Sequence, residues 1–368
     1  MHISDYRSIA ISKLPSIVFD YLDGGAERET GIAHNRQVLD AIRFRPKRLV
    51  DVSSRDTSIN LMGGTISAPI IVAPTGMNSL FWRNADCILA KVATEQNIPF
   101  VLSTASTSSI EEVANACCRE PWFQLYVIDR KQAKMLVDRA IHAGYSTLVL
   151  TVDATVNGIR DRDLRNGFHP RMKPSLALFA SALSRPAWTV RMLRDGLPRL
   201  ANFESESVEG NKVQQSLTSR LMDASFSLDD LSWLREKWPK RLVVKGIVNA
   251  QDVCRCIKVG VDGVVLSNHG GRQLDSCISP MELLPEVSNV GIDIMVDSGF
   301  RRGSDVLKAI ASGAKAVMLG RSILYGLAAN GEAGVRGVIE SMKHEIDTNL
   351  AQIGCASMNA LTYDYLSK

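Results

Sequence analysis

Eight short apolar runs recur along this chain of 368 residues, and stretches with the apolar spacing of an amphipathic helix lie between most of them. Nearly continuous apolar runs are typical of parallel strands that are buried on both faces. The runs are residues 69–73, 99–102, 122–126, 147–152, 241–245, 263–266, 293–296 and 315–319. The helical stretches include residues 86–96, 110–116, 131–143, 250–259 and 303–311. This alternation predicts an α/β fold, a closed (β/α)8 TIM barrel.

An open, doubly wound sheet is the alternative to the barrel. It would carry a glycine-rich dinucleotide fingerprint after its first strand, and no such fingerprint follows residues 69–73. We therefore expect one domain over residues 1–368, with a helical N-terminal segment before a barrel core at about residues 66–330. The fourth and fifth strands are too far apart for one strand–helix unit, which predicts an insertion at about residues 165–225.

The composition is that of a soluble globular protein, with 45% hydrophobic and 22% charged residues. A net charge of +4 gives no indication of nucleic-acid binding. The seven cysteines are odd in number and lack the spacing of zinc ligands, so no metal site is predicted. Reduced thiols and a charged opening sequence in place of a signal peptide predict a cytoplasmic protein.

Part of the predicted insertion, residues 170–200, combines basic and apolar side chains. It holds six basic residues and one acid, Asp195, interleaved with residues such as Trp188 and Leu193. This mixture favours contact with an anionic membrane surface, while a lid or an oligomer contact is the alternative. Its longest uncharged run, residues 174–184, is shorter than the roughly 20 residues that a membrane span needs.

In a TIM barrel, the active site is built at the carboxyl ends of the strands. All eight predicted ends carry a polar group, a glycine or both. These residues include Thr75, Gly76, Ser103, Gln124, Tyr126, Thr151, Asp153, Lys245, Ser267, His269, Asp297, Gly299, Gly320 and Arg321. The pattern supports a site at this end of the barrel without identifying its chemistry.

The hexapeptide SNHGGR, residues 267–272, directly follows the sixth run. The imidazole of His269 can accept a proton near neutral pH, and the guanidinium of Arg272 can bind a carboxylate through two hydrogen bonds. This pair suits an enzyme that acts at the carbon next to a carboxylate. The alternative is a histidine and an arginine that only cap or solvate the loop.

Two arginine-containing glycine loops follow the last two runs. They are residues 299–303 (GFRRG), which contain Arg301, and the pair Gly320 and Arg321. In TIM barrels, these loops frequently bind phosphate through backbone amides and a helix N-terminus. A phosphorylated cofactor or substrate is therefore expected, with a salt-bridged surface as the alternative.

Lys245 ends an apolar strand, so its ammonium group is expected inside the mouth of the barrel. A desolvated lysine can form a Schiff base. It can also serve as a fixed cation beside an electron-accepting ring, or form a structural salt bridge. The residue type alone does not decide between these roles.

Three further residues have two interpretations each. Asp153, after the fourth strand, can orient a histidine, and Arg160 can share a substrate carboxylate. Either can instead pair with Arg162 or Asp163 in a charged loop. Tyr21 lies before the barrel and, from the sequence pattern alone, is favoured as a helix-packing residue.

Taken together, the motifs resemble those of the FMN-dependent 2-hydroxy acid dehydrogenase and oxidase family. The most specific are residues 267–275 (SNHGGRQLD) and 297–303 (DSGFRRG). Residues 102–106 (LSTAS) and 122–126 (WFQLY) are most similar to the bacterial mandelate-oxidising members. The resemblance extends from about residue 14 to about residue 365.

The resemblance implies FMN at the mouth of the barrel. Lys245 would place its charge near N1 and the C2 oxygen of the flavin and favour the reduced anion, and Ser267 and Asp297 would contact the ring or the ribityl chain. The residues expected to line the ring are Pro74, Thr75, Gly76, Ser103, Gln124 and Thr151. Those expected to hold the phosphate are Gly299, Arg301, Gly320 and Arg321.

The resemblance also assigns the substrate-facing groups. His269 would be the catalytic base with Asp153 as its partner, and Arg160 and Arg272 would bind the substrate carboxylate. The last two catalytic and substrate-binding residues are Tyr21 and Tyr126, which would hydrogen-bond the substrate. This implication reverses the packing interpretation of Tyr21.

Two small residues bear on the substrate and the electron acceptor. Ala105 stands where glycolate-type oxidases tend to carry tryptophan, so an aromatic substrate is expected, oxidised from (S)-mandelate to benzoylformate. Gly76 stands where oxidases often carry alanine, which indicates slow reaction with oxygen. The expected acceptor is a membrane quinone, reached by a homotetramer lying peripherally on the inner face of the cytoplasmic membrane.

Two alternatives stay open at this point. The first is an L-lactate dehydrogenase or a broad 2-hydroxy acid oxidase of the same family. The second is a barrel lyase that uses Lys245 as a Schiff base and the arginine loops for a substrate phosphate.

Overall fold

The centre of the molecule is a sheet of eight parallel strands, seen in a computed structural model that describes residues 1–117, 121–167, 181–196, 198–203 and 222–367. The strands are β3 (Ile70–Val72), β4 (Val101–Ser103), β5 (Trp122–Leu125), β6 (Thr147–Thr151), β7 (Arg241–Ile247), β8 (Gly263–Leu266), β9 (Asp293–Val296) and β10 (Ala316–Leu319). Their order is β3-β10-β9-β8-β7-β6-β5-β4. All eight coincide with the predicted runs.

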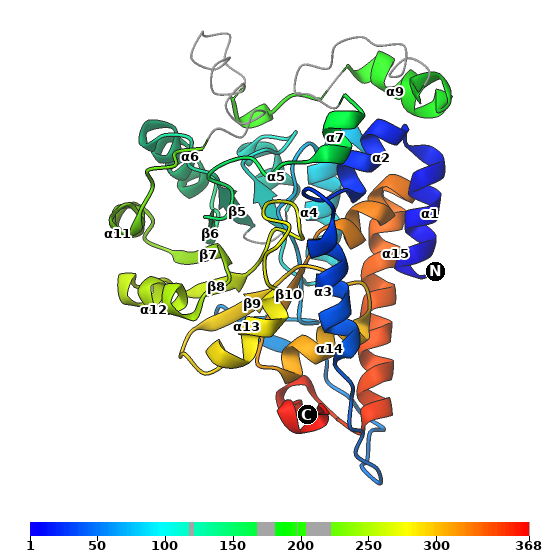
Figure 1. Ribbon diagram of the computed structural model, residues 1–368, viewed down its shortest axis with the longest axis vertical. Coiled ribbons are helices and arrows are strands. Elements are labelled where there is room, and N and C mark those ends of the chain that lie inside the picture. Colours follow the sequence, from blue (N-terminus) through cyan, green and yellow to red (C-terminus); the bar gives the residue numbers. More distant parts are fainter. Residues whose placement is uncertain (118–120, 168–180, 197, 204–221, 368) are drawn as a thin grey trace.

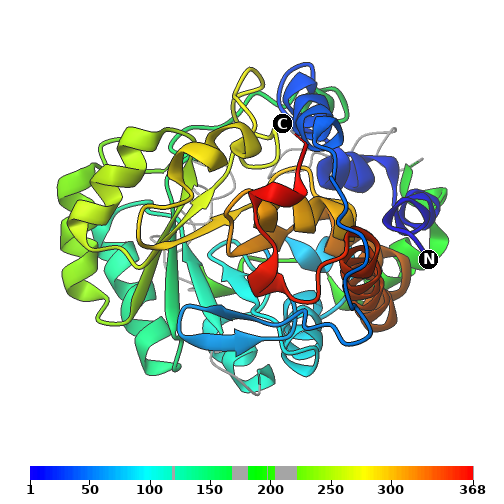
Figure 2. The same ribbon diagram turned by 90° about the horizontal axis from the view of Figure 1, so that it is seen from below.

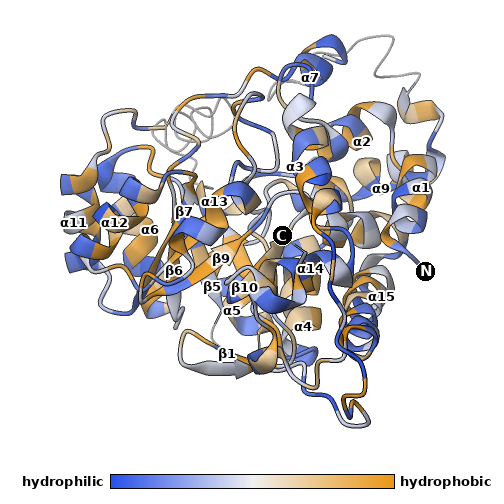
Figure 3. Cartoon of the chain, turned by 60° about the horizontal axis from the view of Figure 1, so that its bottom comes forward, coloured by the Kyte–Doolittle hydropathy of each residue, from blue (hydrophilic) through white to orange (hydrophobic). Residues whose placement is uncertain are grey.

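The sheet curls into a nearly closed barrel, because its two outer strands meet. A parallel bridge joins Val72 of β3 to Phe100, the residue before β4, and the Val72 amide donates to the Pro99 carbonyl at 2.9 Å. The strands are buried almost throughout and form the apolar centre of the molecule (Figure 3). The predicted (β/α)8 barrel is therefore confirmed.

Helices surround the barrel (Figure 1). They include α4 (Ala85–Glu95), α5 (Ile110–Ala116), α6 (Arg130–His142), α11 (Leu228–Lys237), α12 (Ala250–Val259), α13 (Pro280–Val287) and α14 (Gly303–Ala311). Local sequence fixes several ends: Ser109 accepts a hydrogen bond from the Glu112 amide at the start of α5, and Gly260 ends α12 in a left-handed conformation. The five predicted helices agree with the structure within one residue at each end.

The N-terminal segment forms α1 (Ile3–Lys13), α2 (Ser16–Asp23) and α3 (Thr30–Ala41). The first of these packs along α15 (Arg321–Ile353) at one side of the barrel (Figure 1). The backbone of α15 breaks at Asn330 and Gly331. Gly331 has φ +56°, and a Cβ there would lie 2.4 Å from the Trp82 ring, so only glycine fits this break.

The amino end of the barrel is partly covered by a hairpin of β1 (Ile59–Leu61) and β2 (Gly64–Ile66) (Figure 2). Its turn, Met62 and Gly63, has positive φ at both residues, as a two-residue hairpin turn requires. The Met62 amide donates to the Asp293 carboxylate at 2.9 Å. This contact anchors the hairpin to the start of β9.

The long connection between β6 and β7 contains α7 (Asp161–Arg165), α9 (Pro186–Asp195) and the 3-10 turn η2 (Ala201–Phe203). The Trp188 indole of α9 donates to the Leu80 carbonyl at 2.8 Å, and Arg191 donates to the Phe81 carbonyl at 2.9 Å. Arg191, one of the six basic residues of segment 170–200, therefore contacts the main chain of the barrel side rather than extending into solvent. The predicted insertion and domain limits stay predictions, because much of residues 165–225, including Arg171 and Lys173, lies outside the described residues.

Two large apolar side chains of α9 are exposed. Val190 is 63% exposed and Leu193 is 80% exposed. Within the described part of the chain, no helix has both the length and the hydropathy needed to cross a bilayer.

Candidate active site

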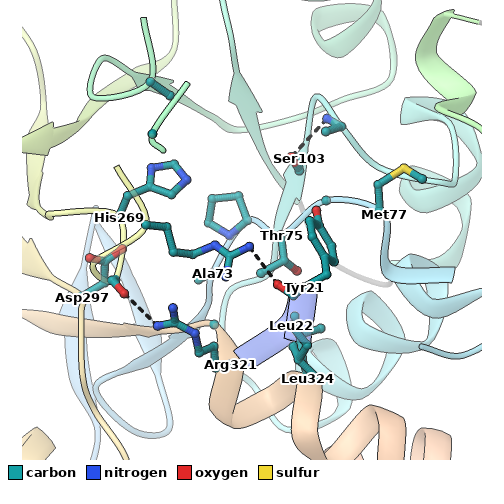
Figure 4. Close-up of a pocket in the computed structure, with 18 of the residues that line it drawn as sticks. Tyr21, Leu22, Ala73, Thr75, Met77, Ser103, His269, Asp297, Arg321 and Leu324 are labelled. Atoms are coloured by element: carbon teal, nitrogen blue, oxygen red, sulfur yellow. Dashed lines mark hydrogen bonds between the residues drawn. The ribbon is translucent and has the colours of Figure 1, made fainter. Parts of the chain in front are cut away.

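A cavity of about 880 Å³ opens at the carboxyl ends of the strands and extends to α2 (Figure 4). Most of the site residues expected from the sequence line it: Tyr21, Pro74, Thr75, Gly76, Ser103, Ala105, Tyr126, Thr151, Arg160, Lys245, His269, Arg272, Asp297, Gly299, Arg301, Gly320 and Arg321. Gln124, Asp153 and Ser267 stand directly behind this lining and hydrogen-bond to it. The fold thus brings all the predicted groups to one place.

His269 lies in the loop after β8, in a left-handed conformation with φ +57°. Its Nδ1 is 3.0 Å from Asp153 Oδ1, and its Nε2 is 3.4 Å from the Tyr126 hydroxyl. The His269 amide donates to Ser267 Oγ at 3.0 Å. These contacts hold the imidazole with Nδ1 against a carboxylate and Nε2 at the cavity, the arrangement of an oriented general base.

Asp153 remains a carboxylate. Burial by itself raises the pKa of this acid, but the hydrogen bond and charge of His269 and the nearby Lys245 ammonium outweigh it and lower the pKa. Close packing fixes its position, because a Cβ at Gly246 would lie 2.6 Å from Asp153 Cγ. Gly246 has φ +108°, so this strand bulge depends on glycine in two ways.

Lys245 is a buried cation with two close polar partners. Its Nζ donates to Ser267 Oγ at 2.8 Å and lies 2.8 Å from Asp297 Oδ2. Burial lowers the pKa of the ammonium, but the Asp297 and Asp153 carboxylates together outweigh burial and raise it. A lysine held protonated is a poor Schiff-base nucleophile, so the geometry favours a fixed cation.

The ends of β4, β5, β6 and β7 form a polar row beside Lys245. Ser103 pairs in register with Gln124, and Thr151 pairs with Lys245. Ser103 Oγ donates to Gln124 Oε1 at 3.0 Å. Gln124 Nε2 and Thr151 Oγ1 are buried and have no hydrogen-bond partner among the described residues. Such groups call for a bound polar ligand, and the row fits the polar edge of a flavin ring.

A second set of groups fits a phosphate. Gly320 precedes the first residue of α15, Arg321, whose guanidinium donates to the Gly24 and Gly270 carbonyls at 2.8 Å each. Arg321 Nε is buried without a partner in the described chain. Arg301 lies over the Tyr325 ring at 5.9 Å. Two guanidinium groups and a helix N-terminus at one wall of the cavity favour an anion.

The two arginines expected to bind a substrate carboxylate differ in their contacts. Arg272 donates to the Gly24 carbonyl at 2.5 Å and to the Tyr21 carbonyl at 2.9 Å, and lies 5.5 Å over the Tyr21 ring. Arg160 is buried, and its Nε and NH2 atoms have no hydrogen-bond partner within the described residues. Its NH1 is 3.7 Å from Asp163 Oδ2.

Sequence reasoning missed Asp163 as part of this cavity. The residue lines the cavity together with Pro198, Leu200 and Met222 of the long connection. The sequence feature that pointed to Asp163 was its spacing of three residues from Arg160, which places both side chains on one face at the start of α7. Tyr21, which the sequence pattern alone favoured as a packing residue, has two roles. Its ring stacks on that of Phe81 with the centroids 6.3 Å apart, and it also lines the cavity.

Comparison with known proteins gives this arrangement a family. Residues 10–368 match the profile of the FMN-dependent dehydrogenases. The chain belongs to that family. FMN is therefore its cofactor, as the sequence resemblance implied, and its chemistry is oxidation and reduction. The lyase alternative is accordingly wrong.

Individual relatives cover nearly the whole chain. It is 51% identical to the (S)-mandelate dehydrogenase of Pseudomonas putida over 366 residues, 99% of this chain and 93% of that protein. An L-lactate dehydrogenase of Pseudomonas putida is 38% identical, over 99% of this chain and 97% of the relative. The crystal structure of the monotopic membrane protein (S)-mandelate dehydrogenase superposes with a TM-score of 0.97 at 51% identity, over 100% of this chain and 98% of that one.

Proposed function

We propose that this protein oxidises (S)-mandelate to benzoylformate with FMN. The observation that carries the proposal is the His269–Asp153 pair, whose imidazole Nε2 faces the same cavity as two arginine side chains. A base beside a carboxylate-binding site is what oxidation next to a carboxylate requires. The similarity to (S)-mandelate dehydrogenase supports this choice of substrate.

Each substrate-facing group then has a task. Arg160 and Arg272 neutralise the substrate carboxylate and fix its orientation. Tyr21 and Tyr126 donate hydrogen bonds to the bound acid. His269 Nε2 takes up the proton that the alcohol loses on becoming a ketone, and Asp153 stabilises the resulting imidazolium.

FMN, when bound, accepts the two electrons that leave the substrate carbon. The groups proposed to hold its ring are Pro74, Thr75, Gly76, Ser103, Gln124, Thr151, Lys245 and Asp297. Gly299, Arg301, Gly320 and Arg321 are proposed to hold its phosphate. Ser267 faces Lys245 rather than the cavity, so its proposed role is to orient the lysine.

Small side chains leave space for an aromatic substrate. Ala105 lines the cavity, and a Cβ added at Gly76 would lie 2.9 Å from the Ala105 methyl group. The two residues are thus in close contact, and a larger side chain at either position would fill the space proposed for the phenyl ring. L-Lactate is the second candidate substrate, because L-lactate dehydrogenases are also among the relatives.

We also propose that the protein works at the cytoplasmic membrane, as a peripheral homotetramer that passes its electrons to a quinone. The exposed Val190 and Leu193 of α9 support a membrane contact, and the relative with a TM-score of 0.97 is described as a monotopic membrane protein. Apolar side chains of this kind enter the interfacial region of a bilayer.

The test of the proposed substrate is the visible spectrum of the anaerobic holoenzyme before and after (S)-mandelate is added. Rapid loss of the oxidised flavin band with (S)-mandelate, and none with (R)-mandelate, supports the proposal. A flavin that is reduced by L-lactate and left oxidised by (S)-mandelate would transfer the proposal to the second candidate.

A further inference from the structure

Asp163 is a buried carboxylate in the same cavity as Arg160 and Arg272. It lies on α7 and lines the cavity, with its carboxylate 3.7 Å from Arg160 NH1. The positive charge of Arg272, in the loop after β8, also acts on it. The two guanidinium groups line the same cavity and repel each other, and a carboxylate beside them reduces this repulsion before substrate binds.

The other nearby cation is engaged elsewhere. Arg162 pairs with Glu29, and its NH1 is 3.3 Å from Asp23 and 3.6 Å from Asp20. These acids belong to α2 and the loop after it, which lie beside α7 (Figure 1). Asp163 therefore faces the negative charges of Asp20 and Glu29 as well as the positive charges of Arg160, Arg162 and Arg272.

Arg160 and Asp163 form an ion pair without a hydrogen bond. Their separation of 3.7 Å is too long for one, and Arg160 Nε and NH2 remain without a partner in the described part of the protein. An arginine with partners on all of its donors would offer nothing to a second carboxylate. Asp163 is close enough to hold Arg160 by charge and leaves its hydrogen-bonding edge available.

We propose that Asp163 is a positioning residue and counter-ion of Arg160. It keeps Arg160 in place by charge before substrate binds, and it weakens the binding of carboxylates to Arg160, including the carboxylate of the keto acid product. The inference rests on the proposed function in taking the substrate to be a carboxylate. With Asp163 ionised, the two arginines and Asp163 together carry one net positive charge, which a bound carboxylate cancels. When Asp163 is neutral, the same group of side chains carries two net positive charges, and a carboxylate binds more tightly.

Burial raises the pKa of Asp163 to about 6, against opposing effects from Arg272 and Arg162. The counter-ion is therefore mostly present at neutral pH and is lost as the pH falls below this value. Carboxylate affinity should rise over the same interval.

The test uses the FMN-loaded enzyme and benzoate, an aromatic carboxylate that the enzyme cannot oxidise. Benzoate Kd is measured by calorimetry from about pH 5 to about pH 8 for the wild type and for Asp163→Asn, which keeps the shape and removes the charge. Near pH 8, the variant is expected to bind benzoate about tenfold more tightly. The wild-type affinity should approach that of the variant as the pH falls through about 6.

Two further variants serve as controls. Asp161→Asn removes an acid from the same helical turn, outside the cavity lining, and should follow the wild type. Asp163→Glu keeps the charge and should retain the pH dependence. In turnover with (S)-mandelate, Asp163→Asn is expected to lower KM and to strengthen inhibition by benzoylformate, a combination that a merely structural residue would not give.

Weaker benzoate binding by Asp163→Asn near pH 8, or a pH dependence unchanged from the wild type, would overturn the inference. The two proposals can fail separately. If Asp163→Asn binds benzoate more tightly but (S)-mandelate does not reduce the flavin, the proposed substrate fails and the role of Asp163 stands.

Discussion

Buried positive charges are paired differently at the inner end of the cavity, at the strand ends, and at its outer end, at α7. At the inner end, Lys245 has a hydrogen bond to Ser267 and an ion pair with Asp297, both at 2.8 Å. At the outer end, Arg160 is 3.7 Å from Asp163, and two of its nitrogen atoms have no partner among the described residues. The outer cation therefore keeps more hydrogen-bond donors available for a ligand than the inner one.

One cavity can thus combine a charge that belongs to the fold with a charge that binds a ligand. A buried cation with good partners is part of the fold, and removing it leaves carboxylates unpaired. A buried cation with poor partners destabilises the fold unless a ligand satisfies it. We therefore expect stability to depend on the inner end and substrate affinity to depend on the outer end.

The largest expected effect is that of Lys245→Met. This substitution leaves Asp297 and Asp153 without their shared cation and should lower the free energy of unfolding by about 4 kcal/mol, measured by urea denaturation of the FMN-free protein. The double variant Lys245→Met with Asp297→Asn should recover part of the loss, because it removes one of the stranded charges. An additive double variant would contradict the pairing.

Arg160→Met should have little effect on stability and a large effect on KM. It removes a buried guanidinium group with few partners, so the free energy of unfolding should stay the same or rise by up to about 1 kcal/mol. The lost carboxylate contact should raise KM for (S)-mandelate about 100-fold, the equivalent of about 3 kcal/mol. Arg165→Met, an exposed arginine of the same helix, is the matched control and should leave KM unchanged. A large loss of stability in Arg160→Met would remove the contrast with Lys245.

The two buried aspartates should show opposite pH effects on stability. Asp163 has its pKa raised from 3.8 to about 6 by burial, so its ionised form destabilises the fold, and stability is gained as the pH falls from about 6 to about 4. Asp163→Asn should therefore raise the free energy of unfolding by about 2 kcal/mol near pH 7.5 and by almost nothing near pH 4.

Asp153 has a lowered pKa, despite the opposing effect of burial, because of His269 and Lys245. It therefore contributes stability above its ordinary pKa, and that contribution is lost as the pH falls through the lowered value. Asp153→Asn should destabilise the protein near pH 7.5. Denaturation curves that shift in the same direction for Asp153→Asn and Asp163→Asn would show that the two ends are alike.

The smallest expected effect concerns the outer surface. Leu193→Asp should reduce partition onto anionic phospholipid vesicles about tenfold, because one apolar side chain no longer enters the bilayer interface. Leu228→Asp, at an exposed apolar position on α11, provides a matched control and should bind as the wild type does. Equal losses in both variants would point to overall charge rather than to α9 as the cause.

Much of the site was predictable because strand ends and loop motifs are local in sequence. Asp297, His269 and Lys245 each end a recognisable apolar run, and barrel topology brings such ends together whatever their separation in the chain. The role of Tyr21 came from the family resemblance alone. Its helical pattern looked like packing, and the cavity lining at α2 depends on how the N-terminal helices dock.

The spacing of Asp163 from Arg160 did not by itself place the residue in the cavity, because a charged loop offers several equivalent partners. Its environment arises from α7, α2 and the loop after β8, which are distant in the chain. The inward orientation of Arg191 has the same origin, since it depends on the Phe81 carbonyl of a turn more than 100 residues earlier.

The barrel, its eight strands and the set of polar groups at their ends follow from the amino-acid sequence, because apolar periodicity and loop chemistry are local properties. Which charges are paired depends on the packing of the folded chain. Lys245 lies on β7 and Arg160 directly before α7, and nothing in their local sequence separates a paired charge from an available one. The distinction depends on distances of 2.8 Å and 3.7 Å to carboxylates, which are set by packing across the barrel rather than along the chain.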